Sequence, residues 1–72
     1  MNDTLMGIYE RTLNNCKFYE KQEDRAHLLN EVGCLRGVAY CMELAGECPH
    51  NDDFMHFIQA QNIILDELTA EA

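Results

Sequence analysis

Serine and tryptophan are both absent from this sequence of 72 residues. Without serine, the chain cannot carry a serine nucleophile, which excludes hydrolases of the Ser-His-Asp type. Long apolar runs are missing too: the longest, 37–42 and 63–65, are far shorter than the roughly 20 residues of a membrane-spanning helix. No basic segment precedes an apolar one, so no signal peptide is expected. We therefore expect a cytoplasmic protein whose four cysteines are reduced thiols.

Basic residues are scarce, and none occurs after Arg36. The formal net charge is −8, from thirteen acidic and five basic residues. Residues 1–36 hold six acids and all five bases, whereas residues 37–72 hold seven acids and no base. This balance argues against direct binding to nucleic acid, which requires clustered Lys and Arg. It also argues against binding to an anionic membrane surface.

The acidic residues of the second half form the first candidate site. Because no base lies near them in the sequence, we expect them to lack internal partners and to face outward. Such a surface binds a basic protein surface through electrostatic complementarity. The alternative is a solvated face that serves only solubility. The predicted partner-binding residues are Glu43, Glu47, Asp52, Asp53, Glu67 and Glu71.

Apolar residues recur at helical spacing along the chain, and no strand-like alternation occurs. The pattern predicts an all-α fold with one domain, 1–72, and helices over 3–20, 24–45 and 52–69. Short connections favour antiparallel neighbours. We therefore expect either a small three-helix bundle or a helical hairpin with the third helix packed across it.

The boundaries of the second helix follow from local signals. Segment 21–24 is the predicted break before it, with Asp24 able to cap the helix. This segment contains neither Gly nor Pro, so a continuous helix through it is the alternative. Gly46 suits the position just after the helix, and Pro49 prevents continuation.

The second predicted helix is apolar on two sides. Leu28, Val32, Leu35, Ala39 and Met42 share one side, and the other carries Ala26, Leu29, Gly33, Tyr40 and Leu44. A helix that is apolar nearly all round is buried on more than one face, and two further short helices can hardly cover it. Small side chains recur every fourth residue from Gly33 to Ala45, which lets another helix approach closely.

We therefore predict a homodimer packed through the second helix. The alternative is that the glycines accommodate a bulky neighbour within one chain. The predicted oligomer contacts are Gly33, Gly37, Tyr40, Cys41 and Leu44.

The third predicted helix has an apolar stripe that contains one polar residue. The stripe consists of Phe54, Phe57, Ile58, Gln61, Leu65 and Leu68, with Ile64 at its edge. Gln61 lies in the middle of this stripe, where a polar side chain needs a hydrogen-bonding partner. Met55 and Ile63 point away from the stripe.

Residues suited to chemistry are few. We expect Cys34 and Cys41 to be buried thiols that behave as small apolar side chains. Cys48, His50 and His56 resemble a partial zinc site, but no C-x₂-C pair completes the ligand set. Cys48 and His50 also lack a third group that would orient them for nucleophilic catalysis. We therefore expect no enzyme activity, no cofactor and no bound metal, with a small metal-binding module as the minor alternative.

Two function hypotheses follow. The first is a protein–protein interaction module whose acidic half binds a basic surface of a nucleic-acid-handling protein. In size and charge, although in no motif, the chain is similar to small acidic inhibitors carried by bacteriophages, including anti-CRISPR proteins. That resemblance implies an inhibitor that acts in the host cell cytoplasm. The second hypothesis is a structural or regulatory homodimer without such a target.

Overall fold

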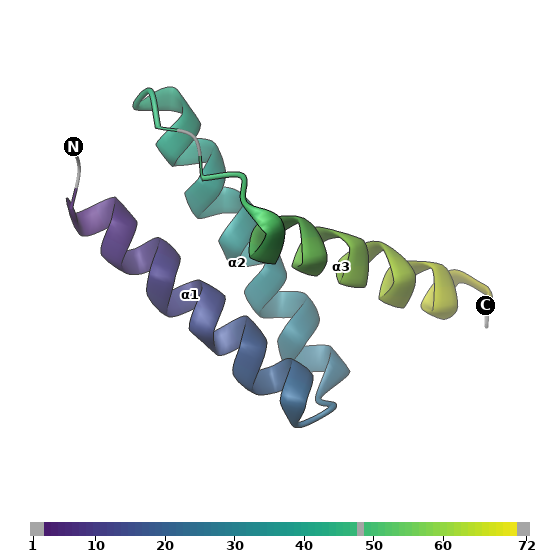
Figure 1. Ribbon diagram of the computed structural model, residues 1–72. Coiled ribbons are helices and arrows are strands. Elements are labelled where there is room, and N and C mark those ends of the chain that lie inside the picture. Colours follow the sequence, from purple (N-terminus) through teal and green to yellow (C-terminus); the bar gives the residue numbers. More distant parts are fainter. Residues whose placement is uncertain (1–2, 48, 71–72) are drawn as a thin grey trace.

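The computed structural model describes residues 3–47 and 49–70, and within them the chain forms three α-helices. Helix α1 is Asp3–Lys21, α2 is Arg25–Leu44 and α3 is Asp52–Ala70. The predicted bounds are confirmed to within one residue at each end. Helices α1 and α2 form an antiparallel hairpin, and α3 lies obliquely across it (Figure 1). The all-α prediction is confirmed, in its form of a hairpin with a third helix across it.

The chain breaks between α1 and α2 rather than continuing as one helix. The backbone N–H of Asp24 donates a hydrogen bond to the carbonyl of Tyr19 at 3.1 Å. Glu23 has a φ of 58°, a left-handed conformation that costs an L-residue free energy and does not propagate a helix. Asp24 then caps α2, because its Oδ1 accepts the backbone N–H of His27 at 3.2 Å.

Local backbone and side-chain signals end α2 near Gly46 and begin α3 at Asn51. Gly46 has a φ of 87°, and the N–H of Glu47 donates to the carbonyl of Met42 at 2.8 Å. This bond satisfies a carbonyl that the end of the helix leaves open. On the other side, Asn51 Oδ1 accepts the N–H of Phe54 at 2.8 Å and caps α3.

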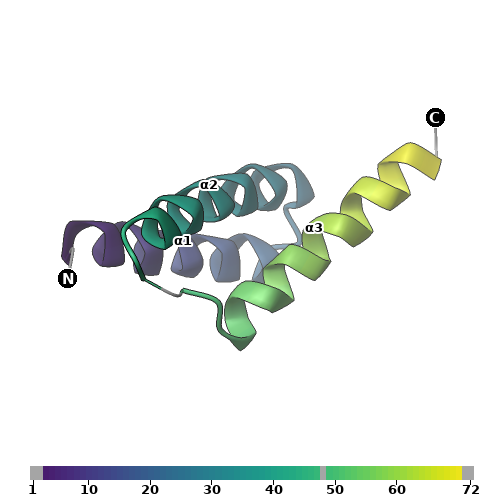
Figure 2. The ribbon, with the colours of Figure 1, turned by 90° about the horizontal axis from the view of Figure 1, so that it is seen from above.

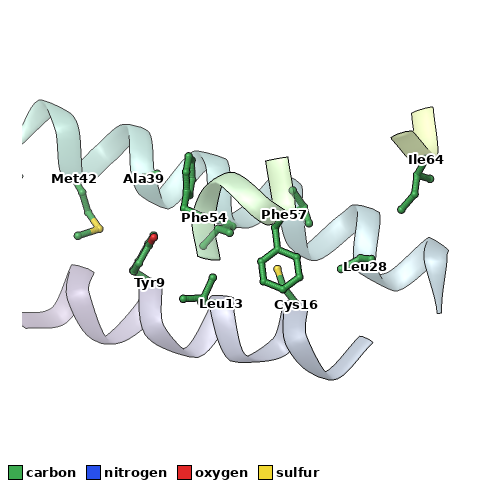
Figure 3. Close-up of a cluster of buried hydrophobic side chains, with 11 residues drawn as sticks. Tyr9, Leu13, Cys16, Leu28, Ala39, Met42, Phe54, Phe57 and Ile64 are labelled. Carbon is green, nitrogen blue, oxygen red and sulfur yellow. The ribbon is translucent and has the colours of Figure 1, made fainter. Parts of the chain in front are cut away.

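The core lies along the hairpin seam and is closed on one side by the first half of α3. All five predicted inward residues of α2 are buried. Figure 3 shows Phe57 pointing from α3 toward Cys16 of α1. The buried apolar residues are Tyr9, Leu13, Cys16, Leu28, Val32, Leu35, Ala39, Met42, Phe54, Phe57 and Ile64.

The second half of α3 corrects the predicted stripe. Leu65 and Leu68 are 44% and 53% exposed, whereas Ile64 is buried. The reason is the direction of α3, which diverges from the hairpin toward its C-terminal end (Figure 2). There, Ile64 still belongs to the same buried cluster as Leu28 of α2. Met55 and Ile63, predicted to point away from the stripe, are exposed, so that prediction is confirmed.

The divergence of α3 gives an elongated molecule of 43 × 21 × 18 Å. Its radius of gyration is 12.7 Å, against about 11 Å for a compact domain of this length. Because α3 diverges from the hairpin, much apolar surface of α2 and α3 stays uncovered within one chain.

None of the described helices is both long enough and apolar enough to cross a bilayer.

Candidate interaction surfaces

The predicted acidic residues separate into two groups in space. Glu43 lies in the last turn of α2, Glu47 lies just beyond that helix, and Asp52 and Asp53 begin α3, so these four surround one loop. We call them the acidic loop group. Glu67 lies 15 residues beyond Asp52 on the same helix, or about 22 Å along its axis. The predicted residue Glu71 lies outside the described residues.

Three of the predicted acids have internal partners, so the expectation that they have none is wrong. Lys17 Nζ lies 3.1 Å from Asp53 Oδ2. Arg25 forms an ion pair with Glu67, and His50 bonds Glu43 through its Nε2. For Asp53 and Glu67 the reason is the tertiary structure, because folding places Lys17 of α1 and Arg25 of α2 beside α3. These pairs are solvent-exposed, and such pairs contribute little to stability.

Charge remains in the acidic loop group after these pairs are counted. Among the described residues, Glu47 and Asp52 have no ion-pair partner. Within the described ranges, Lys17 is the single permanent cation paired with the four carboxylates, because His50 is charged only when protonated. The loop end of the molecule is therefore negatively charged, although less than the sequence alone indicates.

The second candidate surface is the face of α2 that points away from the core. All five predicted oligomer contacts are exposed; Tyr40 is 61% and Leu44 72% exposed. A Cβ atom added at Gly33 or Gly37 would meet no atom within 4 Å. The alternative that these glycines accommodate a neighbour within the chain is therefore wrong.

The burial of the cysteines differs from the prediction. Cys34 and Cys41 are exposed, because they lie on the outer side of α2 rather than toward α1. Cys16 is fully buried instead. Burial raises the pKa of the Cys16 thiol to about 12, and the nearby carboxylate of Glu31 adds to this. Cys16 is thus a neutral core thiol at physiological pH.

A groove between α2 and α3 adjoins the outer face of α2. Exposed Tyr40 and Met55 line it together with partly buried Ile58. Arg36 lies at its rim and donates from Nη1 to Oε1 of Gln61 at 2.8 Å. This bond confirms that Gln61 has a hydrogen-bonding partner. The sequence signal for the groove was present in the apolar spacing of Met55 and Ile58, but the position of α3 was needed to interpret it.

Each histidine bonds a carboxylate, which sequence reasoning did not anticipate. His56 Nε2 lies 2.6 Å from Glu20 Oε2, His27 Nδ1 lies 2.6 Å from Asp24 Oδ2, and His50 bonds Glu43. The backbone N–H of His27 and then its ring lower the pKa of Asp24. The two histidines of the metal hypothesis thus bond different acids, and Cys48 lies outside the described residues.

Two kinds of candidate chemical site are absent from the described part of the chain. Within residues 3–47 and 49–70, no three His, Cys, Asp or Glu side chains are placed to hold one metal ion. The described buried side-chain nitrogen and oxygen atoms all have hydrogen-bonding partners. Comparison with protein-family models, with curated proteins and with solved structures finds no match for this chain.

Proposed function

We propose that this protein is a non-enzymatic protein–protein interaction module whose acidic loop group binds a basic surface of a nucleic-acid-handling protein. The observation that carries the proposal is the surplus of negative charge at the α2–α3 loop. Four carboxylates gather there with one lysine among their partners, and Glu47 and Asp52 have no described partner. The charge is thus available to an outside cation.

The class of partner follows from charge. A protein that handles nucleic acid carries clustered Lys and Arg to neutralise phosphates. A carboxylate cluster competes for the same cations, and its long-range field speeds the encounter. An acidic module of this kind acts as an inhibitor when it occupies a nucleic-acid channel. Its binding weakens as salt screens the charges.

Charge reversal tests the proposal. The test variant is Glu47→Lys/Asp52→Lys, because neither residue has a described internal ion pair whose loss would disturb the fold. The control is Glu10→Lys/Glu23→Lys, which changes the net charge equally at exposed residues outside the acidic loop group. Tagged wild type and both variants capture proteins from host-cell extract at low and high salt, and mass spectrometry identifies them.

We expect wild type and the control to capture a nucleic-acid-handling protein at low salt and to lose it at high salt. The loop variant is expected to capture little of it under either condition. Equal capture by the loop variant and the control would overturn the proposal. Capture that persists at high salt would also contradict it, since the contact would then not be electrostatic.

The second candidate function is a structural or regulatory homodimer packed through α2. The high exposure of Tyr40 and Leu44 on one helix face favours it, because large apolar patches on soluble proteins mark interaction sites. Sedimentation velocity of wild type and Gly37→Leu tests it, with circular dichroism as a check of folding. The chain has space for a side chain at Gly37, so the variant is expected to fold but to sediment as a monomer. A strictly monomeric wild type at tens of micromolar would contradict this function.

A further inference from the structure

We propose that the groove where α3 diverges from the hairpin binds a basic amphipathic helix of a partner protein. The end of α1, the α1–α2 turn, the start of α2 and the middle of α3 line this groove. It is separate from the acidic loop group and from the outer face of α2. The inference goes beyond the proposed function, because it assigns a second binding surface and the kind of segment that fits it.

The groove has an apolar floor and an open side. Leu28 of α2 and Ile64 of α3 belong to the floor and are 6% and 7% exposed, whereas Ile63 lies on the wall and is 58% exposed. Ala60 adds a small, half-buried side chain beside them. The volume is about 660 Å³. Because α3 diverges from the hairpin toward its C-terminal end (Figure 2), no part of the described chain fills this space.

The shape of the groove fits a helix better than a small molecule. Sites for small ligands enclose most of the ligand surface, whereas the rim residues Glu20, Glu23 and Gln59 are all exposed. A groove between two helices accepts an amphipathic helix, whose apolar residues at positions i, i+3, i+4 and i+7 face the floor. The open side then leaves the polar face of the bound helix in water.

The charge of the rim selects a basic occupant. Glu23 has no ion-pair partner among the described residues. Glu20 bonds His56 at 2.6 Å, and this imidazole is charged only when protonated. Arg25 also lines the groove, but it is already paired with Glu67 of α3. The two rim carboxylates are therefore available to a cation from outside.

The charges around the groove have the same overall sign. Four carboxylates and two permanent cations lie at the α1–α2 turn and its contact with α3, which leaves an excess of two negative charges; they are Glu20, Glu23, Asp24 and Glu67 against Lys21 and Arg25. His27 bonds Asp24 but is charged only when protonated. Lys or Arg side chains of an occupant are attracted to this end of the molecule, and acidic ones are repelled.

The carboxylates of the rim lie on one wall only. Glu20 and Glu23 come from the end of α1 and the turn, whereas the α3 wall presents His56, Gln59 and Ile63. The occupant is therefore expected to carry Lys or Arg along one edge of its apolar stripe and uncharged polar residues along the other. A cation on that edge competes with His56 for Glu20.

A synthetic peptide tests the proposal. The probe is an amphipathic helix of about 18 residues, with leucine on its apolar face, lysine along one edge and glutamine along the other. One control peptide has glutamate in place of lysine, and a second has the composition of the probe in scrambled order. Backbone amide NMR shifts of the full chain locate the bound peptide, and isothermal titration calorimetry measures its Kd.

Matched variants separate the groove from the rest of the surface. Ile63→Gln is expected to weaken binding of the basic peptide about tenfold, because it removes apolar area from the contact. Its control is Leu68→Gln, since Leu68 is 53% exposed on the same helix but does not line the groove. Glu23→Gln is expected to weaken binding about threefold at low salt and to have no effect at high salt. Its control is Glu10→Gln, at an exposed acid elsewhere on α1.

We expect the largest amide shifts at Leu28, Ala60 and Ile64, and much weaker binding of both control peptides. Equal Kd values for Ile63→Gln and Leu68→Gln would overturn the proposal, as would shifts confined to Tyr40 and its neighbours. Absence of binding at about 1 mM peptide would also overturn it.

The acidic loop group provides the last comparison. Glu47→Lys/Asp52→Lys leaves the groove intact, so this variant should bind the peptide with a Kd close to that of wild type at high salt. Loss of binding in this variant, with the groove variants unaffected, would assign the peptide to the acidic loop group and overturn the groove site. Failure of the groove site would leave the proposed function of the acidic loop group standing, because the two surfaces share no residue.

Discussion

The hydroxyl of Tyr9 donates a buried hydrogen bond of 2.7 Å to the backbone carbonyl of Pro49, forty residues later in the chain. This bond connects the first helix to the loop that carries the acidic loop group. The ring of Tyr9 also stacks with Phe54, at 6.5 Å between ring centroids. Burial, followed by the charge of Asp53, raises the pKa of Tyr9, so the hydroxyl stays protonated and able to donate.

Tyr9→Phe tests the contribution of this bond. The variant keeps the ring but leaves the Pro49 carbonyl without its donor, which costs about 1–3 kcal/mol for a buried group. Urea denaturation followed by circular dichroism measures the loss. Tyr40→Phe is the matched control, because Tyr40 is exposed and a surface change of this kind stays within about 0.5 kcal/mol. Equal stability of both variants would show that the bond contributes nothing.

The thiols are expected to differ in reactivity. Cys34 and Cys41 are exposed, whereas the Cys16 thiol is buried and its pKa is raised to about 12. At pH 8, iodoacetamide should modify Cys34 and Cys41 in the folded protein and modify Cys16 only after denaturant is added. Peptide mass spectrometry reads each site separately. Modification of Cys16 at the rate of Cys34 in native buffer would contradict the buried position.

Alkaline pH is expected to destabilise the protein partly through Cys16. The pKa of this thiol rises from 9.0 to about 12 on folding, so above pH 9 the unfolded chain loses its proton first. The folded state then binds more protons, and the free energy of unfolding falls as pH increases from about 9 toward 12. Denaturation midpoints across this range measure the slope. Cys16→Ala should show a shallower decline than wild type, and parallel slopes would contradict the linkage.

Two adjacent residues of α3 test which side of that helix is buried. Ile64 is 7% exposed and Leu65 is 44% exposed, although the apolar spacing alone favours Leu65 as the inward residue. Ile64→Ala should lower the free energy of unfolding by about 2 kcal/mol or more. Leu65→Ala should change it by less than about 1 kcal/mol. Chemical denaturation of the two variants, made in parallel, measures both changes. A larger loss of unfolding free energy for Leu65→Ala than for Ile64→Ala would contradict the observed packing.

Local sequence signals account for most of the fold. Asp24, Gly46 and Asn51 are residues whose side chain or backbone conformation ends or begins a helix without any help from distant contacts. The buried face of α2 was predicted correctly, because a hairpin places one whole side of the helix against α1. The sequence also predicted that Gln61 has a partner, since a polar group on an apolar face needs a hydrogen bond.

Predictions from these local patterns were wrong where the burial of a side chain depends on the angle between helices. Periodicity places Leu65 and Ile64 on neighbouring positions of one helix but does not say how far along α3 the hairpin extends. Cys34 and Cys41 have the size and polarity of core residues, and only the position of α1 shows that they lie outside the core. The candidate acids were identified by composition, but their partners were not.

By itself, the sequence determined the three helices, their ends, the inward face of α2 and the segregation of acidic residues into the second half. These properties depend on short-range backbone preferences and on residue type. The tertiary structure decided the rest. It brought Lys17 and Arg25 beside acids of α3, because ion pairs between distant residues require the helices to be placed first. It also left Tyr40 and Leu44 uncovered, because α3 crosses the hairpin obliquely and cannot enclose both faces of α2.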